Sequence, residues 1–124
     1  ERAERFYRGM DEVIARVGVP VQAPRHGARF GLLLGLEREP LDYSDALEHR
    51  VDLMLAFVRE SAERGVYFHD YGGGPCHHGF STAHTEADLD QVLEVMEDDL
   101  FLQEPKIGIV ILIKKFLKDL LLRE

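Results

Sequence analysis

Three amphipathic segments, separated by glycine and proline, constrain the fold of this chain more than any other feature. Residues 2–17, 46–65 and 85–100 repeat large apolar side chains at intervals of three and four, which is the period of a helix with one buried face. Gly18 and Gly65 stand where helix stops are expected. A chain of 124 residues can bury one core but is too short for two domains, so these helices should share a core.

Shorter apolar segments between the helices predict strands. They cover residues 28–36, 66–71 and 77–84, and an extended stretch with two prolines, residues 19–24, precedes them. The glycine run at 72–74 joins the last two segments closely, so we expect them to pair antiparallel. The expected order is helix, strand, helix, strand, strand, helix, followed by a C-terminal helix. Helices on one face of a small antiparallel sheet make an α+β two-layer domain.

Side chains suited to capping mark the starts of two of these helices. Asp42 or Ser44 is expected to cap the second helix. Thr85 is expected to cap the last one, with Asp88 three residues on completing a variant of the capping box. Glu86 and Asp88 also complement the helix dipole. This pattern indicates a helix start and not a catalytic site.

Composition excludes several classes of protein. A net charge of −8 argues against nucleic acid as a partner, because phosphate binding uses a basic face. One cysteine excludes an internal disulfide. The longest apolar stretch has seven residues, far fewer than a membrane span needs, and the first residues do not resemble a signal peptide. We therefore expect a cytoplasmic protein.

The stretch "HDYGGGPCHHGFSTAH", residues 69–84, concentrates residues that can carry chemistry. His69, Cys76, His78 and His84 are weak candidates for a zinc site, because Cys76 and His78 would share one face of a strand while no spacing places the other two. A nucleophilic role for Cys76 lacks a positioned base. The glycine run is followed by proline and a strand, whereas phosphate-binding loops precede a helix. Loop and edge histidines are the favoured interpretation, so no metal ligand is assigned.

Three quoted segments resemble one enzyme family. "GFSTAHTEADLDQVLEVMEDDL" resembles the C-terminal end of class III pyridoxal-phosphate-dependent aminotransferases, among them the glutamate-1-semialdehyde aminomutases. "GVPVQAPRHGARFGLLLG" and "DYSDALEHRVDLMLAFVRESAERGVYF" resemble preceding parts of the same small domain, in the same order. The resemblance covers residues 1 to about 100. The histidine-bearing loop and everything after Leu100 depart from it.

The resemblance implies that the catalytic groups lie elsewhere. In this family the lysine that binds the cofactor, pyridoxal phosphate (PLP), belongs to a large domain upstream of this segment. Residues 1–105 contain no lysine, so no position here can hold PLP in that manner. We assign no catalytic or cofactor-binding residue and expect PLP only in the presence of the missing large domain.

Composition changes abruptly after residue 105. Residues 1–105 hold ten arginines, no lysine and 21 acidic residues, a net charge of −11. Residues 106–124 hold four lysines, one arginine and two acidic residues, a net charge of +3. Isoleucine also becomes frequent there. We divide the chain into a small domain, residues 1–103, and an added tail, residues 104–124.

The tail breaks from the preceding helix at Pro105 in this interpretation and carries one apolar face. A helix is favoured over a strand followed by a short helix. The expected interaction residues are Ile109, Leu112, Ile113, Phe116, Leu117, Leu120 and Leu121. This face could pack on the domain, form a homodimer or bind another protein; a membrane is less favoured because anionic lipid would repel the acidic body.

The favoured function is therefore an isolated aminotransferase-like small domain, an engineered or chimeric scaffold without activity of its own, whose tail mediates self-packing, homodimerisation or protein binding. The alternative is one piece of a split class III aminotransferase. A zinc-binding module is a less favoured third reading.

Overall fold

A computed structural model describes residues 1–69, 72 and 74–122, with the backbone alone for 104–112, 114, 115 and 122. Its helices are α1 (Arg2–Arg16), α2 (Tyr43–Ala46), α3 (Val51–Glu63) and α4 (Glu86–Leu122). Its strands are β1 (Val21–Gln22), β2 (Arg25–His26), β3 (Arg29–Gly31), β4 (Leu33–Leu34) and β5 (His77–Gly79). The α+β class expected from the sequence is confirmed.

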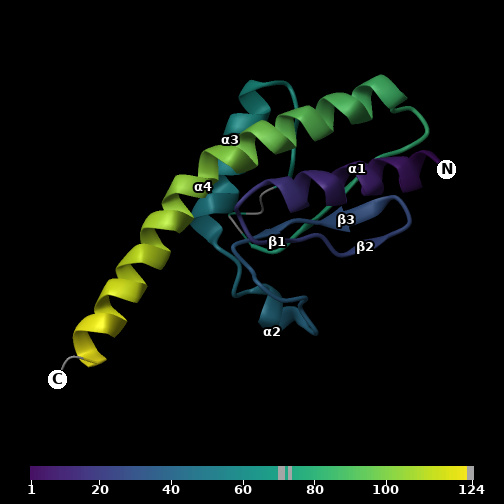
Figure 1. Cartoon of the computed structure of the whole chain (residues 1–124). Coiled ribbons are helices and arrows are strands. Elements are labelled where there is room, and N and C mark those ends of the chain that lie inside the picture. Colours follow the sequence, from purple (N-terminus) through teal and green to yellow (C-terminus); the bar gives the residue numbers. More distant parts are fainter. Residues whose placement is uncertain (70–71, 73, 123–124) are drawn as a thin grey trace.

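Helix α4 organises the packing of the other helices. Both α1 and α3 lie against it, and α3 also contacts β4 (Figure 1). The apolar stripes of the three helices meet in one core, as their periodicity predicts. Its most completely buried large side chains include Met10 of α1, Phe57 of α3 and Met96 and Leu100 of α4.

The strands form two small antiparallel sheets. One pairs β1 with β4, and the other has the order β2-β3-β5. In the second sheet Phe30 lies opposite His78 and Arg29 opposite Gly79. This register brings the histidine-bearing stretch against a strand about fifty residues earlier in the chain.

The predicted pairing of 66–71 with 77–84 is wrong for the described residues. Residues 66–69 have no strand assignment, and 70 and 71 lie outside the described residues. The strand in the second segment covers only His77–Gly79 and pairs with β3. The backbone N–H of His69 donates to the imidazole of His78 at 3.3 Å. In a strand pair, a backbone carbonyl of the neighbouring strand would accept this hydrogen bond instead.

The predicted strand at 28–36 is divided. Its two parts, β3 and β4, belong to different sheets, with buried Leu32 between them. Periodicity cannot show this division, because both parts are apolar and each finds a different partner far away in the sequence.

The predicted helix after Asp42 is also divided. Asp42 caps α2, since its side chain accepts a hydrogen bond from the backbone N–H of Asp45 at 2.9 Å. The chain then extends at Arg50, whose N–H donates to the carbonyl of Leu34 at 2.7 Å. That bond to β4 interrupts the helix, and α3 begins at Val51. Gly65, at φ +86°, follows its end as predicted.

Helix α4 does not stop at Pro105. It runs unbroken from Glu86 to Leu122, which corrects the expected break and joins the last helix and the tail into one element. An interior proline removes one backbone hydrogen bond and its ring meets the carbonyl four residues earlier, which is why a break is expected there; the structure nonetheless keeps the helix through this position. The helical interpretation of the tail is confirmed. Within the part of the chain that the structure describes, no helix is long and apolar enough to cross a membrane.

Candidate functional site

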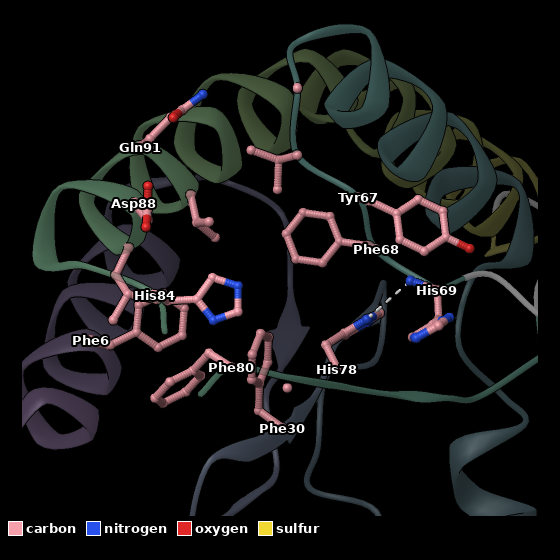
Figure 2. Close-up of a pocket in the computed structure, with 15 residues that line it drawn as sticks. Phe6, Phe30, Tyr67, Phe68, His69, His78, Phe80, His84, Asp88 and Gln91 are labelled. Atoms are coloured by element: carbon pink, nitrogen blue, oxygen red, sulfur yellow. Dashed lines mark hydrogen bonds between the residues drawn. The ribbon is translucent and has the colours of Figure 1, made fainter. Parts of the chain in front are cut away.

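A cleft of about 540 Å³ lies beside the start of α4. Figure 2 shows its floor of phenylalanine rings, with imidazoles around the rim and Asp88 and Gln91 on the α4 side. Residues from α1, β3, the 65–69 segment, β5 and α4 line it: Phe6, Phe30, Gly65, Val66, Tyr67, Phe68, His69, His78, Gly79, Phe80, His84, Asp88, Leu89, Gln91 and Val92.

The aromatic floor is held together by edge contacts. Phe6 meets Phe80 at 5.1 Å between ring centroids, at an interplanar angle of 62°. Phe6 also lies 5.6 Å from Phe30. Such tilted arrangements suit the ring quadrupoles and stabilise the packing beyond area burial. Phe6 and Phe30 thus belong to the core, and Phe80 packs against it.

His78 is the buried polar group of this site. Its residue is only 5% exposed, and its ring lies 5.4 Å from Phe30 and 5.1 Å from Phe68. Its Nδ1 accepts the His69 N–H, so the neutral ring carries its proton on Nε2, which has no hydrogen-bond partner among the described residues. Burial, with smaller contributions from His69 and His77, lowers the pKa of His78 to about 4.

The other members of the predicted zinc set are used locally. The Cys76 thiol donates to the His69 carbonyl at 3.0 Å, and the His69 and His78 rings stack at 6.5 Å. His84 accepts the Ser81 N–H through Nδ1 at 3.0 Å, within the turn before α4. The structure thus brings His69, Cys76 and His78 together and leaves His84 across the cleft (Figure 2). Among the described residues, no group of three or more histidine, cysteine or acidic side chains is placed to hold a metal ion.

The start of α4 is capped as the sequence predicts. Thr85 N–H donates to the Asp88 carboxylate at 2.8 Å, and Asp88 N–H donates to the Thr85 hydroxyl at 3.1 Å. The hydrogen bonds from Thr85 lower the pKa of Asp88. The carboxylate that lines the cleft is therefore committed to the helix end, which confirms that "AHTEADLD" is helix-starting chemistry.

An apolar patch on the opposite side of the strands was not anticipated. We call it the α2 patch, and it consists of Leu41, Tyr43, Leu47 and Val51, which are 91%, 66%, 52% and 41% exposed. In Figure 1 α2 lies below the strands, away from α1 and α4. Several exposed large apolar side chains close together in the sequence are a feature of interaction sites.

The tail forms a second exposed apolar surface. Figure 1 shows the C-terminal part of α4 projecting beyond the rest of the chain. Of the predicted interaction residues, five are described and all are more than half exposed: Ile113, Phe116, Leu117, Leu120 and Leu121. Ile109 and Leu112 lie outside the residues with described side chains. These five side chains therefore remain largely open to solvent within the described structure, and the role of the tail stays a prediction.

Comparison with known proteins adds a relationship to this geometry. The chain is similar to a segment of an aminomutase. Two proteins named glutamate-1-semialdehyde 2,1-aminomutase, from Desulfitobacterium hafniense strains DSM 10664 / DCB-2 and Y51, are each 27% identical to it over 103 residues. The match covers 81% of this chain and 23% of each relative, so the chain spans about a quarter of the relatives' length. No protein-family profile matches the chain.

The residues of this chain do not fit PLP, the cofactor of the enzyme family that the sequence resembles. PLP is held through a lysine amine, and every lysine of the chain lies after position 105, in α4 beyond the body. Lys118, whose side chain is described, is exposed on the projecting tail. The cleft contains imidazoles and aromatic rings but no amine, so it is not a PLP site.

Sequence reasoning found the histidines of the cleft but not its floor. Phe6, Phe30, Phe68 and Phe80 belong to four segments spread over the chain. The pairing of Phe30 with His78 across β3 and β5 is what assembles them. No pattern within a short stretch of sequence predicts a pairing between strands so far apart in the chain.

Proposed function

We propose that this chain is the small-domain part of a class III PLP-dependent aminotransferase or aminomutase and acts together with a large domain that supplies the cofactor lysine. The observation that carries the proposal is the similarity to glutamate-1-semialdehyde 2,1-aminomutase over 103 residues, which covers 81% of this chain. The absence of lysine from residues 1–105 supports a division of labour in which this part holds no cofactor.

The α2 patch is the surface that we assign to the large domain. It joins four exposed apolar side chains, and leaving them in water is unfavourable. It also lies away from the tail, so both surfaces are accessible at once (Figure 1). When bound by the large domain, PLP supplies an electron sink for reactions at amino groups. The contribution of this chain is a wall of the site and not a reacting group.

A reconstitution experiment tests the proposal. The large-domain part of the Desulfitobacterium hafniense aminomutase, without its matched segment, is mixed with the full chain. We expect co-elution, bound PLP seen by its absorbance, and turnover of glutamate 1-semialdehyde. Leu41→Asp should weaken the complex by about tenfold or more, as at an interface hot spot. Leu117→Asp on the tail is the matched control and should leave the complex intact.

A chimera makes the test independent of whether the truncated relative folds. In it, residues 1–103 of this chain replace the matched segment of the aminomutase. A folded chimera that binds PLP and turns over substrate supports the proposal. A folded chimera that binds PLP but shows no turnover, together with no complex between the separate parts, overturns it.

A further inference from the structure

We infer that the tail is a self-association surface on which α4 pairs antiparallel with α4 of a second copy of this chain. The surface, here called the tail stripe, comprises Leu102, Ile113, Phe116, Leu117 and Leu120. This inference goes beyond the proposed function, because it requires neither a large domain nor a cofactor. It commits to one occupant, a second copy.

Exposure is the first observation behind it. The members of the tail stripe are between 51% and 66% exposed, although each is a large apolar side chain. Leu102 lies next to Phe101, itself 60% exposed, at the point where α4 leaves the body (Figure 1). The stretch from there to Leu121 is about 30 Å of helix at 1.5 Å per residue, or three heptads. An element of that length, projecting alone, leaves its apolar face without a partner in its own chain.

Spacing is the second observation. Positions 102, 109, 113, 116 and 120 follow the alternating three-and-four interval of the a and d positions of a coiled coil, and each is apolar. The interval continues through position 106, which is lysine. The pattern is that of a helix pair and differs from the broad face of a helix lying on a flat surface.

Charge decides the orientation. In a parallel pair, the two bodies of charge −11 would lie side by side, which is unfavourable for like charges. In an antiparallel pair, the bodies lie at opposite ends. The tail of each copy, of charge +3, then runs back toward the acidic body of the other.

The acidic body keeps its excess charge after its internal ion pairs are counted. Arg5 binds Glu86 and Asp90, and Arg16 binds Glu97, so α1 neutralises part of the first half of α4. These arginines are already included in the net charge of −11 for residues 1–105. The remaining acidic surface complements the lysines of the partner's tail. Because an antiparallel helix pair is two-fold symmetric, the same contact forms twice.

Sedimentation measures the association directly. We expect the full chain to be a dimer at micromolar concentration and the double variant Leu117→Asp/Leu120→Asp to be a monomer with unchanged circular dichroism of the body. Leu41→Asp removes an apolar side chain on the α2 patch that is even more exposed, at 91% against 51% for Leu117 and Leu120, and is the control; it should remain a dimer. This result does not depend on the outcome of the large-domain experiment, because Leu41→Asp changes only the α2 patch and the double variant changes only the tail stripe.

Cross-linking tests the orientation. In a Cys76→Ser background, antiparallel a and d layers bring position 102 of one copy to position 120 of the other. Leu102→Cys/Leu120→Cys should therefore form a disulfide-linked dimer, whereas Leu102→Cys or Leu120→Cys alone should not.

Three results would overturn the inference. One is a full chain that stays monomeric at high micromolar concentration. Another is disulfide formation by Leu120→Cys alone, which requires parallel helices. The third is a monomeric chain that binds anionic phosphatidylserine vesicles through the tail, which would make the occupant a lipid surface.

Discussion

The burial of His78 predicts a steep loss of stability in mild acid. The folded chain holds this imidazole neutral, with a pKa of about 4, between Phe30 and Phe68. An unfolded chain exposes it, and its pKa returns to the ordinary value near 6.5. Between pH 6.5 and pH 4 the imidazole of His78 is protonated in the unfolded state and neutral in the folded state. The contribution of neutral His78 to stability is therefore complete above pH 6.5 and is lost as the pH falls to about 4.

The size of the effect follows from the two pKa values. Each pH unit between them is worth 1.36 kcal/mol, so the free energy of unfolding should fall by about 3 kcal/mol from this one residue. This is a large fraction of the 5–15 kcal/mol typical of a whole domain. The cause is desolvation, because aromatic rings surround the imidazole and its Nε2 has no hydrogen-bond partner among the described residues.

Urea unfolding at pH 7.5, 6, 5 and 4 measures the effect by difference. Other groups also titrate in this range, so the wild-type chain is compared with His78→Phe and His78→Gln. These two variants should differ from one another in absolute stability but share a shallower pH dependence than the wild type. If the difference between wild type and both variants stays constant from pH 7.5 to pH 4, the imidazole is not buried as described and the reasoning fails.

Two further predictions concern α4. Ser61, fully buried in α3, donates a hydrogen bond to the Asp99 carboxylate at 2.7 Å. Ser61→Ala should therefore lower the free energy of unfolding by about 1–3 kcal/mol in urea, whereas Ser44→Ala, at an exposed serine, should change it very little. Equal effects of the two variants would show that the buried bond adds no stability. Thr85→Ala should cost about 0.5–2 kcal/mol by removing the N-cap hydroxyl. An NMR titration should show the pKa of Asp88 rising only part of the way toward its usual range, because the larger cause of its lowering, the Thr85 backbone N–H, remains; an unmoved pKa would mean that the hydroxyl does not act on the carboxylate.

Features that depend on near neighbours in the chain were predictable. The two side-chain caps, at Thr85 and Asp88 of α4 and at Asp42 of α2, form between groups three residues apart. The bounds of α1 follow from its local apolar periodicity, and the helix stop at Gly65 follows from the freedom of glycine to take a positive φ.

The candidate site was only half predictable. The sequence drew attention to His69, Cys76 and His78, and these do lie together, but around a hydrogen bond and a ring stack and not as a metal set. What they do depends on Phe30, which reaches them through the β3–β5 register. A residue about fifty positions away decides whether an imidazole is a surface group or a buried one.

The sequence by itself determined where α1, α2 and α4 begin, which helix faces are apolar and that the tail differs in charge from the body, because these properties depend on residues close together in the chain. Only the tertiary structure decided that β5 pairs with β3, that Arg50 is drawn to Leu34 and divides a helix, and that α4 passes through Pro105 into the tail. Each of those outcomes is a competition for backbone hydrogen bonds or buried area between distant segments. Its outcome depends on which distant segments the folded chain places in contact, and no single segment of the sequence contains that information.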